Sequence, residues 1–239
     1  EPHINELDEI IVTDFIQDQI NSSTKESRLG INEINLYSRG SLAEALTFIP
    51  GVSSLKTGNS ISKPIIHGMY GSRVGIVTNG IRQNDQEWGA DHAPNIDLNS
   101  FENVQLIKGA AALKYGGDTP GGIIILTSNK KKLIDSLYGN TILNLESNGR
   151  GGTLSSKLIK TTSKGHYFEG HFTLKQFGDF KAPNYMLSNT GLKELDFAVK
   201  LGKNKIISGW EAIYSRFSNE IGILRVSHIG NIQDLLSAL

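Results

Sequence analysis

The sequence contains no cysteine among its 239 residues. Disulfide bridges, thiolate zinc sites and thiol catalysis are therefore excluded together. Without cysteines the sequence also does not indicate whether the protein lies in an oxidising or a reducing compartment. An excess of charge of either sign is also missing, because 24 basic side chains balance 24 acidic ones. Without a basic excess there is no electrostatic reason to expect a nucleic acid as partner.

Long apolar runs are absent as well, and none approaches the roughly 18 residues that a membrane-spanning helix needs. This does not exclude a membrane protein, because closed β-barrels also satisfy every backbone polar group and their strands are only mildly amphipathic. The chain opens on Glu1-Pro2-His3 without a basic and apolar leader. We therefore expect any export signal to have been removed or to lie outside this sequence.

The most informative stretch is residues 101–128, FENVQLIKGAAALKYGGDTPGGIIILTS. Apolar runs at 104–107 and 123–126 predict strands, residues 110–113 predict a helical turn, and the glycine pairs predict a loop between them. A phosphate-binding loop is excluded, because GGDTPGG has neither the GxGxxG nor the P-loop spacing and precedes a strand, whereas an anion cradle needs a helix N-terminus.

This stretch closely resembles the end of the plug domain of TonB-dependent outer-membrane receptors. The family pattern E-x-I-E-V-I-K-G-P-A-S-x-x-Y-G-x-x-x-x-G-G-x-I-N-I matches in its K-G, Y-G and G-G steps, with Ala110 in place of proline. Residues 42–52 resemble the family segment L-x-E-A-L-x-x-I-P-G-V, and residues 64–80 resemble P-x-I-R-G followed by R-V-x-V-L-x-D-G, with His67 in place of arginine. The resemblance implies an α+β plug domain, placed here at residues 14–130.

Local signals predict the elements of this plug. Ser41 with Glu44 three residues on forms a capping box for a short helix that ends at Pro50-Gly51. Residues 64–67 and 73–78 predict strands, Asn79-Gly80 predicts a tight turn, residues 31–36 a strand or turn, and residues 82–95 a loop.

Residues 7–13, LDEIIVT, precede the plug and predict an extended segment. From the residues alone, it is either the first plug strand or a strand that pairs with the edge of a partner. The family resemblance implies the second interpretation, a TonB box in a tail of residues 1–13 that binds the TonB energy-coupling protein. The expected contact residues are Asp8, Glu9, Ile10, Ile11, Val12 and Thr13.

After the basic linker at residues 129–132 the pattern changes to alternation of polar and apolar residues. Segments at 138–147, 166–177 and 192–201 alternate clearly, and those at 153–162 and 206–218 less so. Each is about ten residues long, which suffices to cross a bilayer when tilted. A soluble sandwich would also alternate, but tight turns at 163–165 and 203–205 around a longer loop at 179–191 favour a barrel.

We therefore predict that residues 131–239 are antiparallel strands of a transmembrane β-barrel, about five of them. Residues 219–239 are expected to begin as a loop and end in a helical pattern. Five strands cannot close, so the chain is expected to be an incomplete barrel fragment. Phe168, Phe172, Phe197 and Val199 should face lipid, with Trp210 and Tyr214 as interface anchors.

The resemblance also implies a ligand site between the plug apices and the extracellular loops. The apices are expected at residues 56–60, 69–72 and 83–88, with ligand-facing candidates Lys56, Asn59, Tyr70, Asp85, Gln86, Glu87 and Trp88. Asp85, Glu87, Asp91 and His92 could together hold a metal ion, but their spacing matches no metal motif. A solvated loop is the simpler interpretation, and His67 is expected to be structural. No resident cofactor is expected.

The resulting hypothesis is a receptor in the outer membrane of a Gram-negative bacterium that imports a small scarce nutrient with energy from TonB. The candidates for the nutrient are siderophore-bound iron, haem, a corrinoid or a metal. The alternative is a non-transporting surface or periplasmic binding module with a soluble β-sandwich. An enzyme is not expected, because no serine or cysteine nucleophile with a positioned base stands in a recognisable motif.

Overall fold

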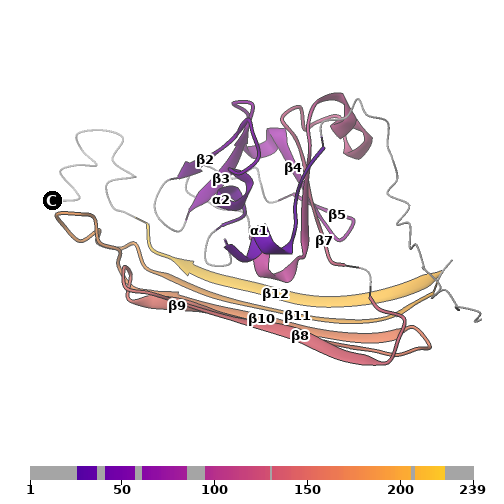
Figure 1. Ribbon diagram of the computed structural model, residues 1–239. Helices are drawn as coiled ribbons and strands as arrows, with labels where there is room; N and C mark the ends of the chain where they lie inside the picture. The colour runs from indigo at the N-terminus through magenta and orange to yellow at the C-terminus, as the bar shows by residue number, and fades with distance from the viewer. Residues whose placement is uncertain are drawn as a thin grey trace, which may run out of the picture.

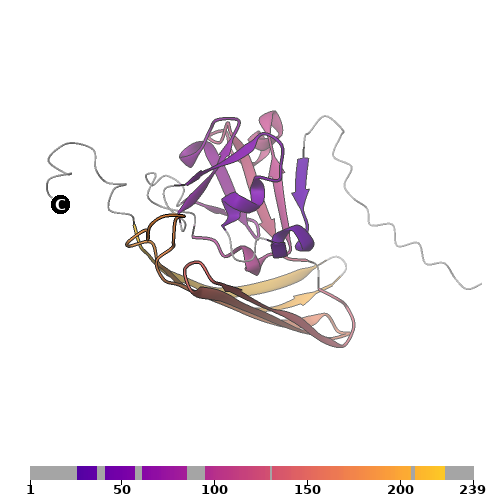
Figure 2. The same cartoon turned by 60° about the vertical axis from the view of Figure 1, so that its left-hand side comes forward.

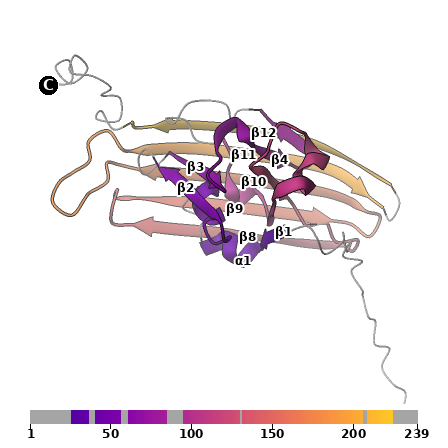
Figure 3. The same ribbon diagram turned by 90° about the horizontal axis from the view of Figure 1, so that it is seen from above.

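The computed structural model describes residues 26–36, 41–56, 61–84, 95–129, 131–205 and 208–223. Within these ranges a mixed α+β body rests on one long antiparallel sheet, which curves beneath it (Figure 1). The turned view in Figure 2 shows the sheet as a single layer with the mixed body on one face. Seen from above in Figure 3, the strands of the sheet extend past the body at both ends. We call the mixed body the plug and the sheet the wall.

The plug is built on a five-stranded sheet of order β1-β6-β7-β4-β5. Its strands are β1 (Glu26–Leu29), β4 (Val74–Thr78), β5 (Ile81–Gln83), β6 (Asn103–Ile107) and β7 (Gly122–Thr127). Only β4 and β7 pair in parallel. Both read as nearly continuous apolar runs because each is covered on both faces. A separate hairpin joins β2 (Val52–Lys56) and β3 (Ser62–Ile66).

Short helices close the plug: α1 (Ile31–Leu36), α2 (Leu42–Leu46) and the 3-10 turns η1 (Gly71–Arg73), η2 (Leu98–Ser100) and η3 (Gly109–Tyr115). The predicted capping box is confirmed, because the Ser41 hydroxyl accepts from the Glu44 amide at 3.2 Å and Glu44 Oε2 accepts from the Ser41 amide at 3.2 Å. No helix in the described ranges is long and apolar enough to cross a membrane.

Two local predictions for the plug were wrong. Residues 31–36 form the helix α1 and not a strand or turn, because Glu33 accepts from the Gly30 amide at 3.0 Å and Ile34 is buried against the plug core. One helical turn is too short to show a period in the sequence. Arg82 and Gln83 belong to strand β5 and not to a loop, since the turn at Asn79-Gly80 folds them back onto β4.

The wall consists of β8 (Ser136–Glu146), β9 (Gly151–Thr161), β10 (His166–Phe177), β11 (Leu192–Asn204) and β12 (Gly209–Ile221). Each strand pairs antiparallel with the next, in the order β12-β11-β10-β9-β8. The five strands predicted from alternation are therefore confirmed, with lengths of 11 to 13 residues. Within the described part of the chain β8 and β12 do not pair with each other, so the sheet is open as expected.

The two faces of the wall have opposite character. The face away from the plug exposes large apolar side chains: Leu137, Leu143, Leu145, Leu158, Phe168, Phe172, Leu174, Leu195 and Leu201. The face toward the plug buries polar and charged ones: Thr153, Ser155, Lys157, Thr161, Glu169, His171, Thr173, Lys175, Asp196 and Lys200.

This arrangement contradicts the soluble-sandwich alternative. A sandwich would bury Phe168 and Phe172 between two layers, but they are 43% and 40% exposed, and no second layer of the described chain covers them. The apolar patch is far larger than scattered surface residues would give.

Candidate functional site at the plug and wall interface

Polar groups carry the contact between plug and wall. The side chains of a strand alternate between its faces, so every second residue of β9, β10 and β11 points toward the plug. On the plug side, Asp97 precedes η2 and accepts from the Asn99 amide at 3.1 Å, which caps this turn against the wall. The following residues, from Ser100 to Glu102, supply the other contacts.

Lys157 of β9 links the wall to several segments of the plug. Its ammonium donates to Glu102 Oε1 at 2.5 Å and to the Ser100 carbonyl at 3.1 Å, and both side chains of the ion pair are largely buried. Glu102 Oε2 also accepts from the Asn129 amide at 2.9 Å. One wall lysine therefore links the start of β6, the end of η2 and the segment after β7.

Glu169 of β10 forms a second buried centre of charge. It pairs with Lys131 of the linker and with Lys200 of β11, the latter at 3.2 Å. The Lys200 ammonium also donates to Ser128 Oγ at 2.7 Å. The chain is thus fixed to the inner wall just where it leaves the plug to enter β8.

His171 of β10 lies between two carboxylates from different bodies. Its Nε2 is 2.9 Å from Asp97 Oδ2 of the plug and 3.9 Å from Asp196 Oδ2 of β11. Ser100 donates to Asp196 Oδ2 at 3.1 Å. Burial raises the pKa of Asp97, but the His171 hydrogen bond and the charge of Lys175 outweigh it, so this pKa lies well below its usual value.

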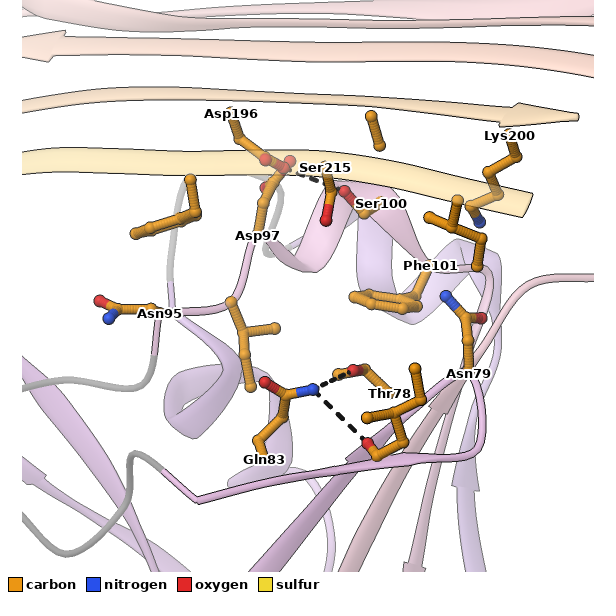
Figure 4. A pocket seen from close by; sticks show the side chains of 15 residues that line it. Thr78, Asn79, Gln83, Asn95, Asp97, Ser100, Phe101, Asp196, Lys200 and Ser215 are labelled. Carbon is orange, nitrogen blue, oxygen red and sulfur yellow. Dashed lines mark hydrogen bonds between the residues drawn. The ribbon is translucent and has the colours of Figure 1, made fainter.

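A cavity of about 270 Å³ opens beside this cluster, between the β4–β5 turn and strands β11 and β12. Figure 4 shows Asp97, Asp196 and Ser100 at its wall side, with Gln83 opposite. The Gln83 amide donates to Thr78 Oγ1 at 2.6 Å. The remaining lining is mixed, so the space is suited to water and small polar groups.

The loops at one end of the wall are tied to each other. Asn148, after β8, donates to the Lys181 carbonyl at 3.0 Å and accepts from the Lys181 amide at 2.7 Å. Asp179 accepts from the Thr190 and Gly191 amides at 2.7 and 3.2 Å, and the bond from Thr190 lowers the pKa of this carboxyl. The long loop at 179–191 is therefore held in one shape by its own side chains.

Few of the predicted site residues fall in the described ranges. Lys56 pairs with Glu44 at 2.5 Å at the end of β2, and Tyr70 is 46% exposed just before η1. The structure describes these two on separate elements. Outside the described residues lie the other predicted ligand-facing residues, the predicted metal candidates and the TonB-box segment: Asn59, Asp85, Gln86, Glu87, Trp88, Asp91, His92 and residues 8–13.

The sequence analysis did not single out Asp97 or Glu102. It did place His171 and Asp196 on the polar side of clearly alternating segments, which is the signal that makes them inward-facing. Lys157 stands in the segment 153–162, where the alternation is weak. Their plug partners follow only from the packing of the two bodies.

Known proteins share both parts of this architecture. Residues 18–123 match the family described as TonB-dependent Receptor Plug Domain. A vitamin B12 transporter, BtuB of Photobacterium profundum, is 29% identical over 93 residues, which are 38% of this chain and 15% of that protein.

Solved structures extend the likeness to the wall. The copper transporter OprC matches with a TM-score of 0.68 and 19% identity over 77% of this chain and 28% of its own. FpvA of Pseudomonas aeruginosa, bound to pyoverdines, matches with a TM-score of 0.66 and 12% identity. The match covers 84% of this chain and 26% of FpvA. The siderophore receptor PirA of Acinetobacter baumannii matches with a TM-score of 0.62 and 14% identity. The match covers 88% of this chain and 34% of PirA. The chain thus spans only about a sixth to a third of the length of these relatives.

A plug seated on the polar face of an open antiparallel sheet defines a class, the plugged barrels. With the family match, residues 18–123 are a TonB-dependent receptor plug domain, and the chain shares the fold of the receptors compared above. Its relatives carry the names of transporters and receptors and not of enzymes, in agreement with the sequence analysis.

Proposed function

We propose that the protein containing this chain is an outer-membrane receptor of a Gram-negative bacterium that binds a scarce nutrient outside and imports it into the periplasm. The observation that carries this proposal is the distribution of side chains on the wall. Polar and charged side chains are buried on the face toward the plug, and large apolar side chains are exposed on the opposite face. A surrounding of lipid makes such an outer face favourable. The plug-domain match at residues 18–123 supports the same function.

The class of nutrient follows from the relatives only in outline. Their names include vitamin B12, copper and ferric enterobactin as ligands. For this protein we propose siderophore-bound iron, haem, a corrinoid or a metal, held between the extracellular loops and the plug apices. The proposed contact residues are Lys56, Asn59, Tyr70, Asp85, Gln86, Glu87 and Trp88.

We propose that the energy arrives mechanically, through residues 8–13. This segment would add as a strand to the edge of the TonB protein, and pulling would then remodel the plug. The interface chemistry supports such a movement. Ion pairs such as Lys157–Glu102 and Lys200–Glu169 exchange their partners for water when the plug shifts, so little free energy is lost compared with the exposure of an apolar core.

Deletion of residues 7–13 in the full-length receptor tests this coupling. A strain that lacks the receptor is first supplied with single nutrients, a ferric siderophore, haem, cobalamin or copper, to find the one whose use depends on it. The deletion should then abolish uptake of that nutrient and leave its binding to whole cells unchanged. Deletion of residues 1–6, which precede this segment and lie outside the plug, should leave both intact. Uptake that survives loss of residues 7–13 would refute the proposal.

A further inference from the structure

The cluster of Asp97, His171 and Asp196 has the donor set of a metal site. One imidazole nitrogen and two carboxylate oxygens lie within 4.8 Å of one another, and all three residues are buried. The donors come from the plug, from β10 and from β11. The site therefore exists only when the plug is seated against the wall.

The distances suit a small ion. Donor atoms around a tetrahedral zinc ion, with bonds of about 2.0 Å, lie about 3.3 Å apart. The His171 Nε2 atom is 2.9 Å from Asp97 Oδ2 and 3.9 Å from Asp196 Oδ2, values on either side of this separation, and all three donor atoms lie within 4.8 Å of one another. The adjoining cavity has room for a water molecule as fourth ligand.

The charges around the cluster also favour a cation. Each lysine of the inner wall nearby has a glutamate partner: Lys157 has Glu102, Lys175 has Glu194, and Lys200 has Glu169.

Two buried aspartates flank one imidazole, and their other hydrogen bonds come from the neutral groups of Asn99 and Ser100. The charge of Lys175, which also stabilises Asp97, is shared with Glu194. A buried carboxylate without a full counter-charge carries a free-energy cost. A divalent ion would remove that cost.

We propose that Asp97, His171 and Asp196 bind a divalent transition-metal ion, zinc first among them, that ties the plug to the inner wall. A mixed imidazole and carboxylate set suits zinc, whereas calcium requires six to eight oxygen ligands. The ion is a structural clamp in this proposal, distinct from any imported nutrient.

The experiment uses the tag-free full-length receptor, purified in detergent and dialysed against metal-free buffer. Zinc content is measured by mass spectrometry, and zinc affinity by competition with a chelating dye. The wild type should retain about one zinc ion per chain, with one imidazole and oxygen neighbours at about 2.0 Å in its X-ray absorption spectrum.

His171→Gln and Asp196→Asn should lower the affinity by more than about 100-fold, because even residues that only orient a metal ligand contribute roughly 10- to 100-fold. His166→Ala is the matched control, an exposed histidine at the start of the same strand. It should keep full affinity. Mobility on an unheated gel shows whether each variant is folded.

A folded wild type without zinc, or equal zinc binding in the wild type and the two cluster variants, would overturn the proposal. Such a result would identify the cluster as a hydrogen-bonded contact only. The assay involves no transport, so its failure leaves the import proposal standing. The variant that lacks residues 7–13 should likewise keep its zinc content, even if it no longer imports the nutrient.

Discussion

At the scale of single residues, the interface depends on charged side chains that each have a defined partner. Lys157 is the clearest case, because its ammonium contacts both Glu102 and the Ser100 carbonyl from the opposite body. Such an ion pair holds the two bodies together. Removal of one partner lowers the stability of the fold, because the other charge stays buried without compensation.

Replacement of Lys157 with methionine should therefore destabilise the seated plug by about 3 kcal/mol, since Glu102 would stay buried without its ammonium. The measurement is the urea midpoint for plug unfolding in the detergent-solubilised receptor. Lys160→Met is the control, three residues on and exposed on the outer face of β9, and should change stability by less than about 0.5 kcal/mol. Equal midpoints for the two variants would show that the Lys157 contact contributes nothing.

At the scale of elements, the glycines of the stretch that ends the plug allow strands to approach closely. Gly122 begins β7 with φ +127°, and a Cβ there would lie 2.7 Å from the Ile107 carbonyl oxygen of β6. The backbone cannot retreat without breaking the β6–β7 ladder, which holds the centre of the plug sheet.

Gly122→Ala should thus destabilise the plug by about 2 kcal/mol or more, through strain at this φ and the contact with β6. The same urea titration provides the readout. Gly117→Ala serves as the comparison, because a Cβ at Gly117 would meet nothing within 4 Å. If the alanine at 122 is as harmless as the one at 117, the close approach of β6 and β7 is not a constraint on the fold.

At the scale of the whole molecule, the proposed location in the outer membrane predicts that lipid covers the apolar outer face of the wall. Phe172 lies near the middle of β10 and Leu137 near the start of β8, both exposed away from the plug. For a strand that crosses a bilayer, the cost of a charge depends on depth, at about 2–4 kcal/mol for a lysine near the midplane and about 0–1 near the interface.

Phe172→Lys should accordingly make the free energy of folding of the full-length receptor into phospholipid vesicles less favourable by about 2–4 kcal/mol. Leu137→Lys should do so by no more than about 1 kcal/mol. Urea titration of the vesicle-bound protein measures both. A lysine tolerated equally well at the two positions would mean that the outer face does not lie in hydrocarbon.

The sequence by itself determined the nature of both bodies. Glycine and capping motifs act locally, and alternation assigns each wall residue to one face whatever the rest of the chain does, so the plug and the inward position of His171 and Asp196 could be predicted. The one-turn helix α1 left no period to detect.

Tertiary structure alone decided which inward charges meet. Asp97 is 74 positions from His171, and Glu102 is 55 from Lys157. No local pattern relates residues so far apart, because their contact depends on how the finished plug lies on the finished wall. The ion pairs and the proposed metal clamp arise at that last step, when polar groups of both bodies lose water together and need one another as partners.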